Sequence, residues 1–231
     1  MTEHSNNIFL SDGRLPIGKI LVACEESQAV TIELRKLGYE AYSCDIMECS
    51  GGHPEWHLMQ DVIELLKQKW GMIIGFPPCT FLSKAGACRL YPTAGNIDPI
   101  RYKKGLEAKE FFMQILNADC ERIAVENPVS LKVFDMPKFT QEIEPYEFGH
   151  PFSKKTRLWL KGLPKLEPTN IVEKKGTYLP SSTSKNAYSG LNDKKTRCPK
   201  IASKTFDGIA KAMADQWTRK SERREKNIIT T

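Results

Sequence analysis

The sequence lacks any hydrophobic run of the length that a membrane requires. No stretch approaches the ~18 to 20 consecutive apolar residues of a transmembrane helix. The first residues, MTEHSNNIFLSDGRLP, are polar and have no apolar centre like that of a signal peptide. Both absences argue against membrane and secreted proteins. We therefore expect a soluble cytoplasmic protein with no membrane partner.

Paired cysteines are also missing. The chain has seven cysteines, an odd number, and no two of them form a Cys-x-x-Cys pair. This pattern argues against a disulfide framework and against a four-cysteine zinc site. We expect most of these thiols to be free and packed in the core.

Internal repeats are absent as well. A chain of 231 residues with 40% hydrophobic side chains is long enough for one domain with a sizeable core.

The net charge of +6 is concentrated in one segment. Residues 163–204 hold nine Lys/Arg against three Asp/Glu, an excess equal to that of the whole chain. Such a stretch suits a nucleic-acid backbone. A solvated loop is the alternative interpretation.

Buried strands and amphipathic helices alternate along the chain. Apolar runs predict strands at 19–24, 39–46, 70–75, 122–125, 145–149 and 157–160. Helical spacing predicts a helix that begins near residue 28 and further helices at 61–69, 101–118 and 206–217, with residues 84–100 as a loop. Gly38 is placed to end the first helix. The long helix is expected to bury Leu106, Phe112, Ile115 and Leu116.

This alternation predicts an α/β fold with a mostly parallel sheet and helices on both faces. In such sheets ligands bind beyond the carboxyl ends of the strands. The side chains best suited to catalysis or ligand binding lie there: Glu25, Asp45, Asp61, Cys79 and Glu126. We therefore expect the functional site at this edge of the sheet.

The first strand is followed by an acidic turn, ACEESQ, which contains no G-x-G. Its two glutamates disfavour a pyrophosphate at the following helix N-terminus. A neutral or cationic nucleoside suits the turn better, and S-adenosylmethionine, with a sulfonium and no phosphate, is one. Asp45 follows at about the 20-residue spacing at which a carboxylate often holds a nucleotide ribose. A plain loop acid is the alternative interpretation of Asp45.

Two further residues can carry chemistry. In GFPPCTFL, Pro77 and Pro78 stiffen the backbone and position the thiol of Cys79 beyond a strand end. Cys79 is then either a nucleophile or an inert buried cysteine. Glu126, which precedes Asn-Pro, can be kept neutral by burial and donate a proton, or it can serve the turn alone.

In combination these motifs are more specific. The order of the acidic turn, Asp45, Asp61, Pro-Pro-Cys, Glu-Asn-Pro and Lys155-Thr156-Arg157 resembles the cytosine-C5 DNA methyltransferases, most closely their short phage- and prophage-type members. The resemblance covers residues 19–162 and resumes at 203–217. It implies a Rossmann-like S-adenosylmethionine-dependent methyltransferase fold, a catalytic core at 19–162 and a packing helix at 203–217. The other segments are then an N-terminal extension (1–18), a basic loop or reduced target-recognition segment (163–202) and a charged tail (218–231).

The resemblance also implies roles. Cys79 would attack C6 of a cytosine flipped out of duplex DNA, and Glu126 would protonate N3. Arg157, and with it Lys155, would lie beside the flipped base. Asp45 would hold the ribose of S-adenosylmethionine and Asp61 its adenine amino group. The implied cofactor-binding set is Cys24, Glu25, Glu26, Ser27, Asp45, Ile46, Asp61, Val62 and Pro77. The host would be a bacterial cell, and the implied role is DNA modification, as in restriction-modification.

The chain departs from the family in two places. The usual Phe-x-Gly-x-Gly of the first turn is replaced by Ala23-Cys24-Glu25-Glu26-Ser27. Only about 40 residues, 163–202, stand where the family inserts a target-recognition domain, so we expect short or relaxed sequence specificity, or a partner that supplies it. RNA or a free cytosine nucleotide as substrate is one alternative. A non-catalytic binder of nucleic acid or cofactor is another, which the presence of both Cys79 and Glu126 disfavours.

The remaining candidates are weaker. Cys49, His53 and His57 lie in CSGGHPEWH, but their spacing is irregular and a fourth ligand is not clear, so no metal is assigned. His150 either contacts phosphate or caps a turn. Trp159 and Trp217 are expected in the core.

Overall fold

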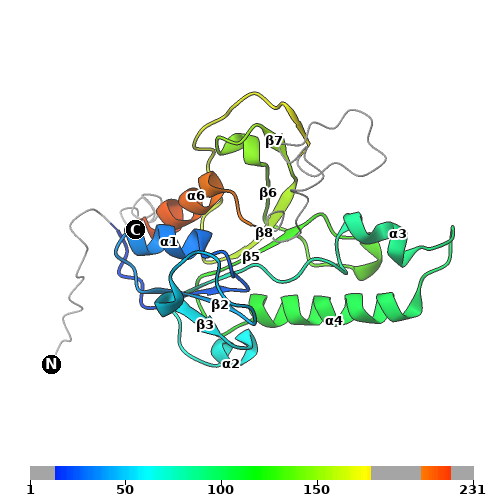
Figure 1. Ribbon diagram of the computed structural model, residues 1–231, viewed down its shortest axis with the longest axis horizontal. Helices are drawn as coiled ribbons and strands as arrows, with labels where there is room; N and C mark the ends of the chain where they lie inside the picture. The colour runs from blue at the N-terminus through cyan, green and yellow to red at the C-terminus, as the bar shows by residue number, and fades with distance from the viewer. Residues whose placement is uncertain (1–13, 178–203, 220–231) are drawn as a thin grey trace, which may run out of the picture.

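The computed structural model describes residues 14–177 and 204–219, which are built around one seven-stranded sheet (Figure 1). From edge to edge its strands are β3 (His57–Met59), β2 (Ala41–Asp45), β1 (Ile20–Ala23), β4 (Met72–Gly75), β5 (Ile123–Pro128), β8 (Thr156–Lys161) and β6 (Gln141–Ile143). The first five are parallel, and β8 is antiparallel to both β5 and β6. The order β3-β2-β1-β4-β5 is that of a Rossmann-like α/β sheet. The predicted fold class is thus confirmed.

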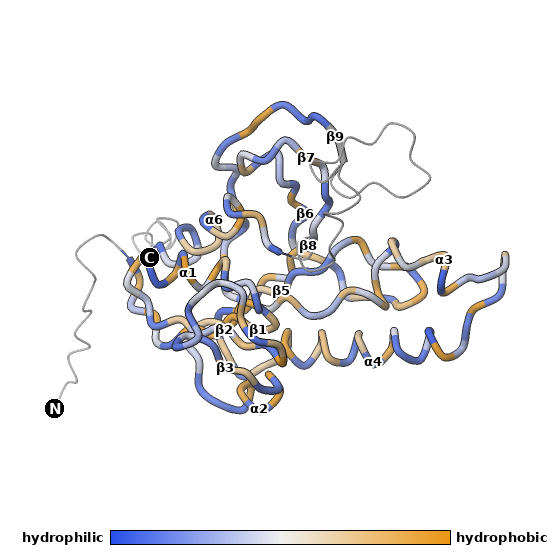
Figure 2. The backbone as a smooth tube through the Cα atoms, in the orientation of Figure 1, coloured by the Kyte–Doolittle hydropathy of each residue, from blue (hydrophilic) through white to orange (hydrophobic). Residues whose placement is uncertain are grey.

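Helices cover both faces of this sheet (Figure 1). On one face lie α1 (Ala29–Lys36) and α6 (Asp207–Thr218), and on the other α2 (Val62–Leu66) and α4 (Pro99–Leu116). Strand β1 contributes side chains to the core on both faces of the sheet. Ile20 and Val22 pack toward α1 and α6, and Leu21 and Ala23 pack toward α2 and α4. Figure 2 shows hydrophobic and hydrophilic positions alternating along α4, as expected of a helix that covers a sheet.

Helix ends carry recognisable signals. Asp61 and Asp98 accept backbone N–H bonds as the N-caps of α2 and α4. Pro99 occupies the first turn of α4, where its missing N–H costs nothing. Gly38, with φ of 84°, follows the C-terminus of α1 as predicted.

The prediction of a strand at 145–149 is wrong. Those residues form a 3-10 turn, η4 (Pro145–Glu147), and the edge strand is β6, just before it. Glu144 and Glu147 form a capping box around this turn, and Pro145 begins it. The local capping chemistry therefore outweighs the apolar and aromatic character of the segment.

Several short elements were not predicted. Residues 84–100, expected as a loop, contain η2 (Lys84–Gly86) and α3 (Ala87–Leu90). Strand β3 was also missed. Further short elements are η1 (Pro54–Trp56), η3 (Lys132–Phe134), and the two-stranded parallel sheet of β7 (Phe152–Ser153) and β9 (Gly176–Thr177).

The predicted burial of Leu106 in α4 is wrong. Leu106 is 43% exposed, whereas Phe112 and Ile115 are buried and Leu116 is half-buried. The neighbouring Gly105 faces the core instead, and a Cβ there would lie 2.2 Å from the ring of Phe134. The helix is rotated so that a glycine lets this ring approach the backbone closely.

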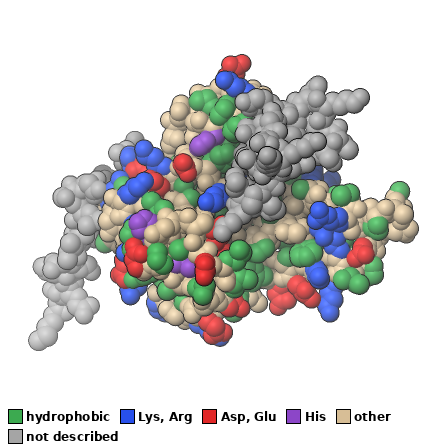
Figure 3. Space-filling model, in the orientation of Figure 1, with side chains coloured by type: hydrophobic (Ala, Val, Ile, Leu, Met, Phe, Trp, Pro, Cys, Tyr) green, Lys and Arg blue, Asp and Glu red, His purple; other side chains and the backbone are tan. Residues whose placement is uncertain are grey.

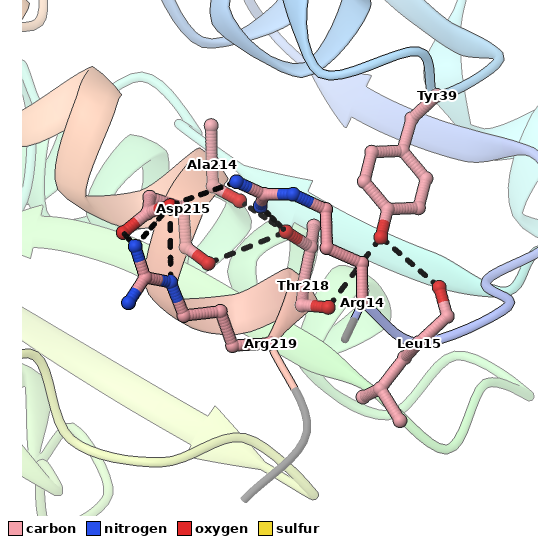
Figure 4. Close-up of polar contacts among 7 residues, drawn as sticks. All are labelled: Arg14, Leu15, Tyr39, Ala214, Asp215, Thr218 and Arg219. Carbon is pink, nitrogen blue, oxygen red and sulfur yellow. Dashed lines mark hydrogen bonds and ion pairs between the residues drawn. The ribbon is translucent and has the colours of Figure 1, made fainter. Parts of the chain in front are cut away.

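The described chain ends are joined (Figure 4). The backbone N–H of Leu15 donates to the Thr218 carbonyl at 2.9 Å, and Arg14 donates to Thr218 Oγ1 at 2.9 Å and to Asp215 at 3.1 Å. The hydroxyl of Tyr39 donates to the Leu15 carbonyl at 3.0 Å. These bonds fasten the end of α6 to the segment before β1.

The predicted segment boundaries are only partly covered. The basic segment 163–202 is described as far as residue 177, and residues 1–13 and the tail beyond residue 219 lie outside the described part of the chain. Within residues 14–177 and 204–219, no helix has the length and apolar character needed to cross a membrane.

Trp217 fixes α6 to the core, as expected for this residue and for Trp159. It is 1% exposed, and its indole N–H donates to the Pro164 carbonyl at 3.0 Å. Replacing Trp217 with alanine is expected to lower the free energy of unfolding by about 3–5 kcal/mol, because it leaves a large cavity and an unpaired carbonyl. Urea unfolding measures this loss. Lys211→Ala, at an exposed site on the same helix, should change stability by no more than about 0.5 kcal/mol. Equal effects of the two variants would contradict the anchoring role.

Candidate active site

The loop after β4 delivers Cys79 to the carboxyl edge of the sheet. The N–H of Phe76, the first residue past β4, donates to the Ala23 carbonyl at 2.9 Å and so holds the loop against the end of β1. The carbonyl of Cys79 accepts bonds from Leu82 N–H at 3.1 Å and Ser83 N–H at 2.9 Å. The prolines and this tight turn fix the half-buried thiol in place.

Glu126 lies inside β5, which continues to Pro128, whereas the sequence predicted that the strand ends at Val125. Its partner in β8 is Leu158, and both residues lie on the sheet face that carries α1 and α6. Desolvation in this position raises the pKa of Glu126 above its ordinary value, and the positive charge of Lys154 partly opposes the rise. Glu126 therefore holds a proton more readily than an exposed glutamate.

The structure brings Cys79 and Glu126 together. Burial raises the pKa of the Cys79 thiol, the nearby Glu126 carboxylate raises it further, and Lys154 lowers it. All three groups therefore lie within electrostatic reach of one another. Such a set can hold a nucleophile, an acid and a balancing cation at one site.

A small pocket opens beside Glu126. Its floor comes from the sheet and its wall from the start of α6, and its lining residues are Phe76, Glu126, Lys154, Thr156, Lys204, Thr205, Phe206, Ile209 and Met213. The ammonium group of Lys154 lies 5.7 Å from the centre of the Phe206 ring. The pocket thus combines aromatic walls with one carboxyl group and two lysines.

Arg157 and Lys155, expected beside the base, point elsewhere. Lys155 Nζ donates to Glu142 at 2.8 Å, and Arg157 Nε donates to the same carboxylate at 3.2 Å. The guanidinium of Arg157 also lies 4.3 Å from the ring centre of Phe139, in the layer that packs toward α4. Because Arg157 pairs with Asn127 and not with Glu126, its side chain lies on the opposite face of the sheet from Glu126.

Lys154 was missed in the sequence, although it is the cation among the described residues whose charge acts on both Cys79 and Glu126. The only signal in the sequence is spacing: Lys154, Thr156 and Leu158 lie two residues apart, just before β8 and in its first half. That alternation identifies a face only once the pairing with β5 is known.

The proposed cofactor residues gather at the ends of β1 and β2. Cys24 follows β1 with φ of 58° and is half-buried. Desolvation raises the pKa of its thiol, and the charges of Asp45 and Asp61 raise it further, which places the two carboxylates close to it. Asp45 accepts the N–H of Met47 at 3.0 Å. Ile46 beside it is 79% exposed. An exposed apolar side chain between carboxylates suits the nucleoside of a cationic cofactor.

Glu25 turns inward instead of toward this edge. It is 4% exposed, and its carboxylate accepts bonds from Val30 N–H at 2.7 Å, Thr31 N–H at 3.2 Å and the Thr31 hydroxyl at 2.8 Å. Burial raises the pKa of Glu25 to about 7, although these donors lower it. Gln28, the N-cap of α1, makes no side-chain cap bond, so Glu25 satisfies the helix in its place.

The remaining residues of the expected cofactor set are Glu26, Ser27, Val62 and Pro77, and they differ in burial and in hydrogen bonding. The carbonyl of Glu26 accepts the N–H of Ser50 at 2.7 Å, which ties the acidic turn to the loop after β2. Ser27 is half-buried at the same turn. Val62 and Pro77 are buried, Val62 among the core residues of the α2 layer.

The three conceivable metal ligands have other partners or positions. The His53 ring stacks on Trp56 at 3.9 Å, and His57 lies between Ser43 Oγ and the Met47 carbonyl, each at 2.9 Å. Among residues 14–177 and 204–219 no group of three potential ligands, with or without Cys49, is placed to hold a metal.

His150, for which two roles were open, accepts the N–H of Gly208 at 3.1 Å and so caps the first turn of α6. Its ring also lies 4.9 Å from that of Phe206. Burial lowers the pKa of His150, against the opposing effect of Asp207. His150 thus supports the pocket wall.

Basic side chains flank the loop that carries Cys79. Figure 3 shows Lys and Arg gathered beside α3 and the adjoining end of α4, where four of them are exposed: Lys84, Arg89, Lys103 and Lys104. The guanidinium of Arg101 and the ammonium of Lys104 lie 4.9 Å and 5.6 Å from the ring of Phe81, two residues after Cys79. A surface of this charge suits phosphate groups.

No family model matches the sequence, and no curated protein matches it. The chain is similar in structure to methyltransferases. One is described as a DNA modification methyltransferase encoded within a prophage (E. coli), with 13% identity and a TM-score of 0.42 over 69% of this chain and 53% of that chain. The Entamoeba histolytica methyltransferase EhMeth has 13% identity and a TM-score of 0.44 over 67% and 57%. The S. pombe Dnmt2 methyltransferase has 14% identity and a TM-score of 0.39 over 64% and 50%. The chain thus spans about half the length of these structures.

Proposed function

We propose that this protein transfers a methyl group from S-adenosylmethionine to C5 of cytosine in DNA through a covalent adduct with Cys79. The observation that carries the proposal is the meeting of Cys79 and Glu126 at the carboxyl ends of β4 and β5, beside an aromatic pocket. A nucleophilic thiol next to a carboxyl group of raised pKa is the pair that attack on a pyrimidine ring requires.

The chemistry balances with these residues. The Cys79 thiolate forms a bond to C6 of cytosine while Glu126 gives its proton to N3, so that the displaced electron pair makes C5 nucleophilic. S-adenosylmethionine, when bound, would supply the methyl group that C5 takes up and would leave as the neutral thioether S-adenosylhomocysteine. The C5 proton then passes to water, the Cys79 thiolate leaves C6, and N3 returns its proton to Glu126. The base is again aromatic, and both side chains are restored.

The cofactor fits the edge formed by β1 and β2. Asp45 and Asp61 supply carboxylates for the ribose and the adenine amino group, and Ile46 supplies an apolar contact for the adenine ring. The negative charge of this edge favours a sulfonium cation and opposes a phosphate-bearing nucleotide. Glu25 contributes by capping α1, which fixes the turn that contains Cys24, Glu26 and Ser27.

DNA is favoured as the substrate by the basic surface along α3 and α4. Lys84, Arg89, Lys103 and Lys104 are exposed and can contact phosphates of a strand whose cytosine reaches Cys79 and Glu126. The base must leave the duplex stack to reach Cys79. Phosphate contacts position a duplex without reading its sequence, which agrees with short or relaxed specificity.

Nucleoside mass spectrometry tests the proposal directly. The chain is expressed in a host without its own cytosine methylation, and 5-methylcytosine is expected in the DNA of these cells but not in cells with the empty vector. RNA and free cytosine nucleotides from the same cells are measured in parallel. Methylated RNA or nucleotide with unmodified DNA would overturn the choice of substrate. Absence of 5-methylcytosine from all three pools, together with cofactor binding by calorimetry, would instead favour a non-catalytic binder.

A further inference from the structure

We propose that Lys154, and not Arg157 or Lys155, is the cation of the candidate active site, where its ammonium group stabilises negative charge on Cys79 and Glu126. The position of Lys154 stands on geometry alone, whereas its part in methyl transfer rests on the proposed function. Two observations carry the assignment: the lining of the pocket and the pairing of β8.

The pocket gives the first argument. Lys154 lines it together with Glu126 and Phe206, whereas neither Lys155 nor Arg157 lines it. Lys155 is exposed and bonded to Glu142, and Arg157 shares that carboxylate on the far face of the sheet. The positive charges of both residues are therefore compensated away from Cys79.

The pairing of β8 gives the second argument. Glu126 lies opposite Leu158, and side chains directly opposite in an antiparallel pair point to the same face. Thr156, two residues before Leu158, also lines the pocket beside Lys154. The alternation of β8 thus directs Thr156 and Leu158 to the Glu126 side, and Lys154, which precedes the strand, lines the pocket beside Thr156.

Among residues 14–177 and 204–219, three charged groups face the thiol or the adjoining pocket. Glu126 reaches Cys79 from β5, Lys154 reaches it from the segment before β8, and Lys204 lines the same pocket from the segment before α6. His150 packs against Phe206 of the pocket, with 4.9 Å between the ring centres. Lys154 lowers the pKa of both Cys79 and Glu126, whereas Glu126 raises the pKa of Cys79.

The sign of a Lys154 substitution follows from these shifts. Removing the ammonium charge raises the pKa of Cys79, so less thiolate is present at any pH below that pKa. Alkylation of Cys79 then slows, and its pH profile moves to higher pH. The same substitution raises the pKa of Glu126, and a protonated Glu126 no longer repels the thiolate. This second effect opposes the first and is removed by Glu126→Gln.

The experiment measures iodoacetamide alkylation of the full chain across a pH series, with each cysteine followed in its own peptide by mass spectrometry. Lys154→Met is expected to slow alkylation of Cys79 at neutral pH by a factor of roughly 3 to 10. Lys154→Arg should restore the wild-type profile because the charge is kept. Lys155→Met removes an adjacent lysine and should leave the Cys79 profile unchanged. The exposed Cys88 is the internal reference in every sample.

Each outcome decides the assignment. If Lys154→Met leaves the Cys79 profile unchanged both alone and with Glu126→Gln, or if Lys155→Met shifts it equally, Lys154 is not the active-site cation. Near-UV circular dichroism verifies the fold, and Lys154→Gln replaces the Met variant if the latter is not native. Alkylation needs neither cofactor nor DNA, so a shifted profile in a protein that methylates nothing supports the place of Lys154 and contradicts only the proposed function. Methylation of DNA by a protein whose Cys79 alkylation profile does not shift in Lys154→Met supports the proposed function and contradicts the place of Lys154.

Discussion

Cys79→Ala is expected to abolish methyl transfer, with a loss on the order of 10⁴-fold or more, because the proposed reaction passes through a bond between this thiol and C6. The thiol is half-buried at the end of a tight turn whose hydrogen bonds come from backbone groups, so alanine should leave that turn intact. Single-turnover transfer of a labelled methyl group to duplex DNA measures the loss. The control is Cys88→Ala, which removes an exposed thiol nine positions along the chain.

A Cys79→Ala protein that is folded, binds cofactor and still methylates cytosine would show that the reaction does not pass through an adduct with this thiol. Equal losses in Cys79→Ala and Cys88→Ala would point to a general effect of cysteine removal. The trapped adduct gives a separate readout, because a cytosine analogue that cannot lose its C5 substituent should attach covalently to wild-type protein and to Cys88→Ala, but not to Cys79→Ala.

The sheet and its two helical layers could be predicted because each rests on local patterns. Continuous apolar runs at β1 and β4 are buried on both faces, as central parallel strands are. The spacing of Val30 and Leu34 in α1, and the left-handed Gly38 after it, are signals that a few neighbouring residues carry. Their physical causes lie in the sequence itself, so the structure confirms them.

The edge of the sheet could not be predicted in the same way. Strand β6 has three residues and η4 follows it at once, so neither gives a period long enough to recognise. The capping box of Glu144 and Glu147 turns the chain at Pro145, and only the pairing with β8 makes the preceding residues a strand. Tertiary contacts decide such short elements.

The candidate site shows the same division between local and tertiary causes. Cys79 and Glu126 could be predicted as candidates because rigid turns and strand ends mark them in the sequence. The choice among Lys154, Lys155 and Arg157 depends on strand register, and a shift of one residue exchanges the two faces of the sheet. The capping role of Glu25 could not be predicted for a related reason, since only the fold shows that α1 lacks a side-chain cap from Gln28 and takes one from Glu25.

Glu126→Gln is expected to lower methyl transfer by a factor of roughly 10² to 10⁴, the usual contribution of a positioned general acid. Glutamine has nearly the same shape and can still donate a hydrogen bond to the base, but it cannot give up a proton to N3. The substitution also removes the carboxylate that raises the pKa of Cys79. The thiol should therefore become more reactive toward iodoacetamide while the enzyme becomes slower.

These opposite signs separate catalysis from a general loss of structure. The proposed reaction needs Glu126 protonated and Cys79 ionised, so the wild-type rate should fall toward both low and high pH, with limbs that belong to the coupled pair. Glu126→Gln removes one member of the pair and should lack the alkaline decline, leaving only a rise with pH as Cys79 ionises. Glu121→Gln, an exposed glutamate just before β5, should behave as wild type in both assays. A Glu126→Gln protein with an unchanged rate and an unchanged alkylation profile would show that Glu126 neither donates the proton nor faces the thiol, because either role alone changes one of the two measurements.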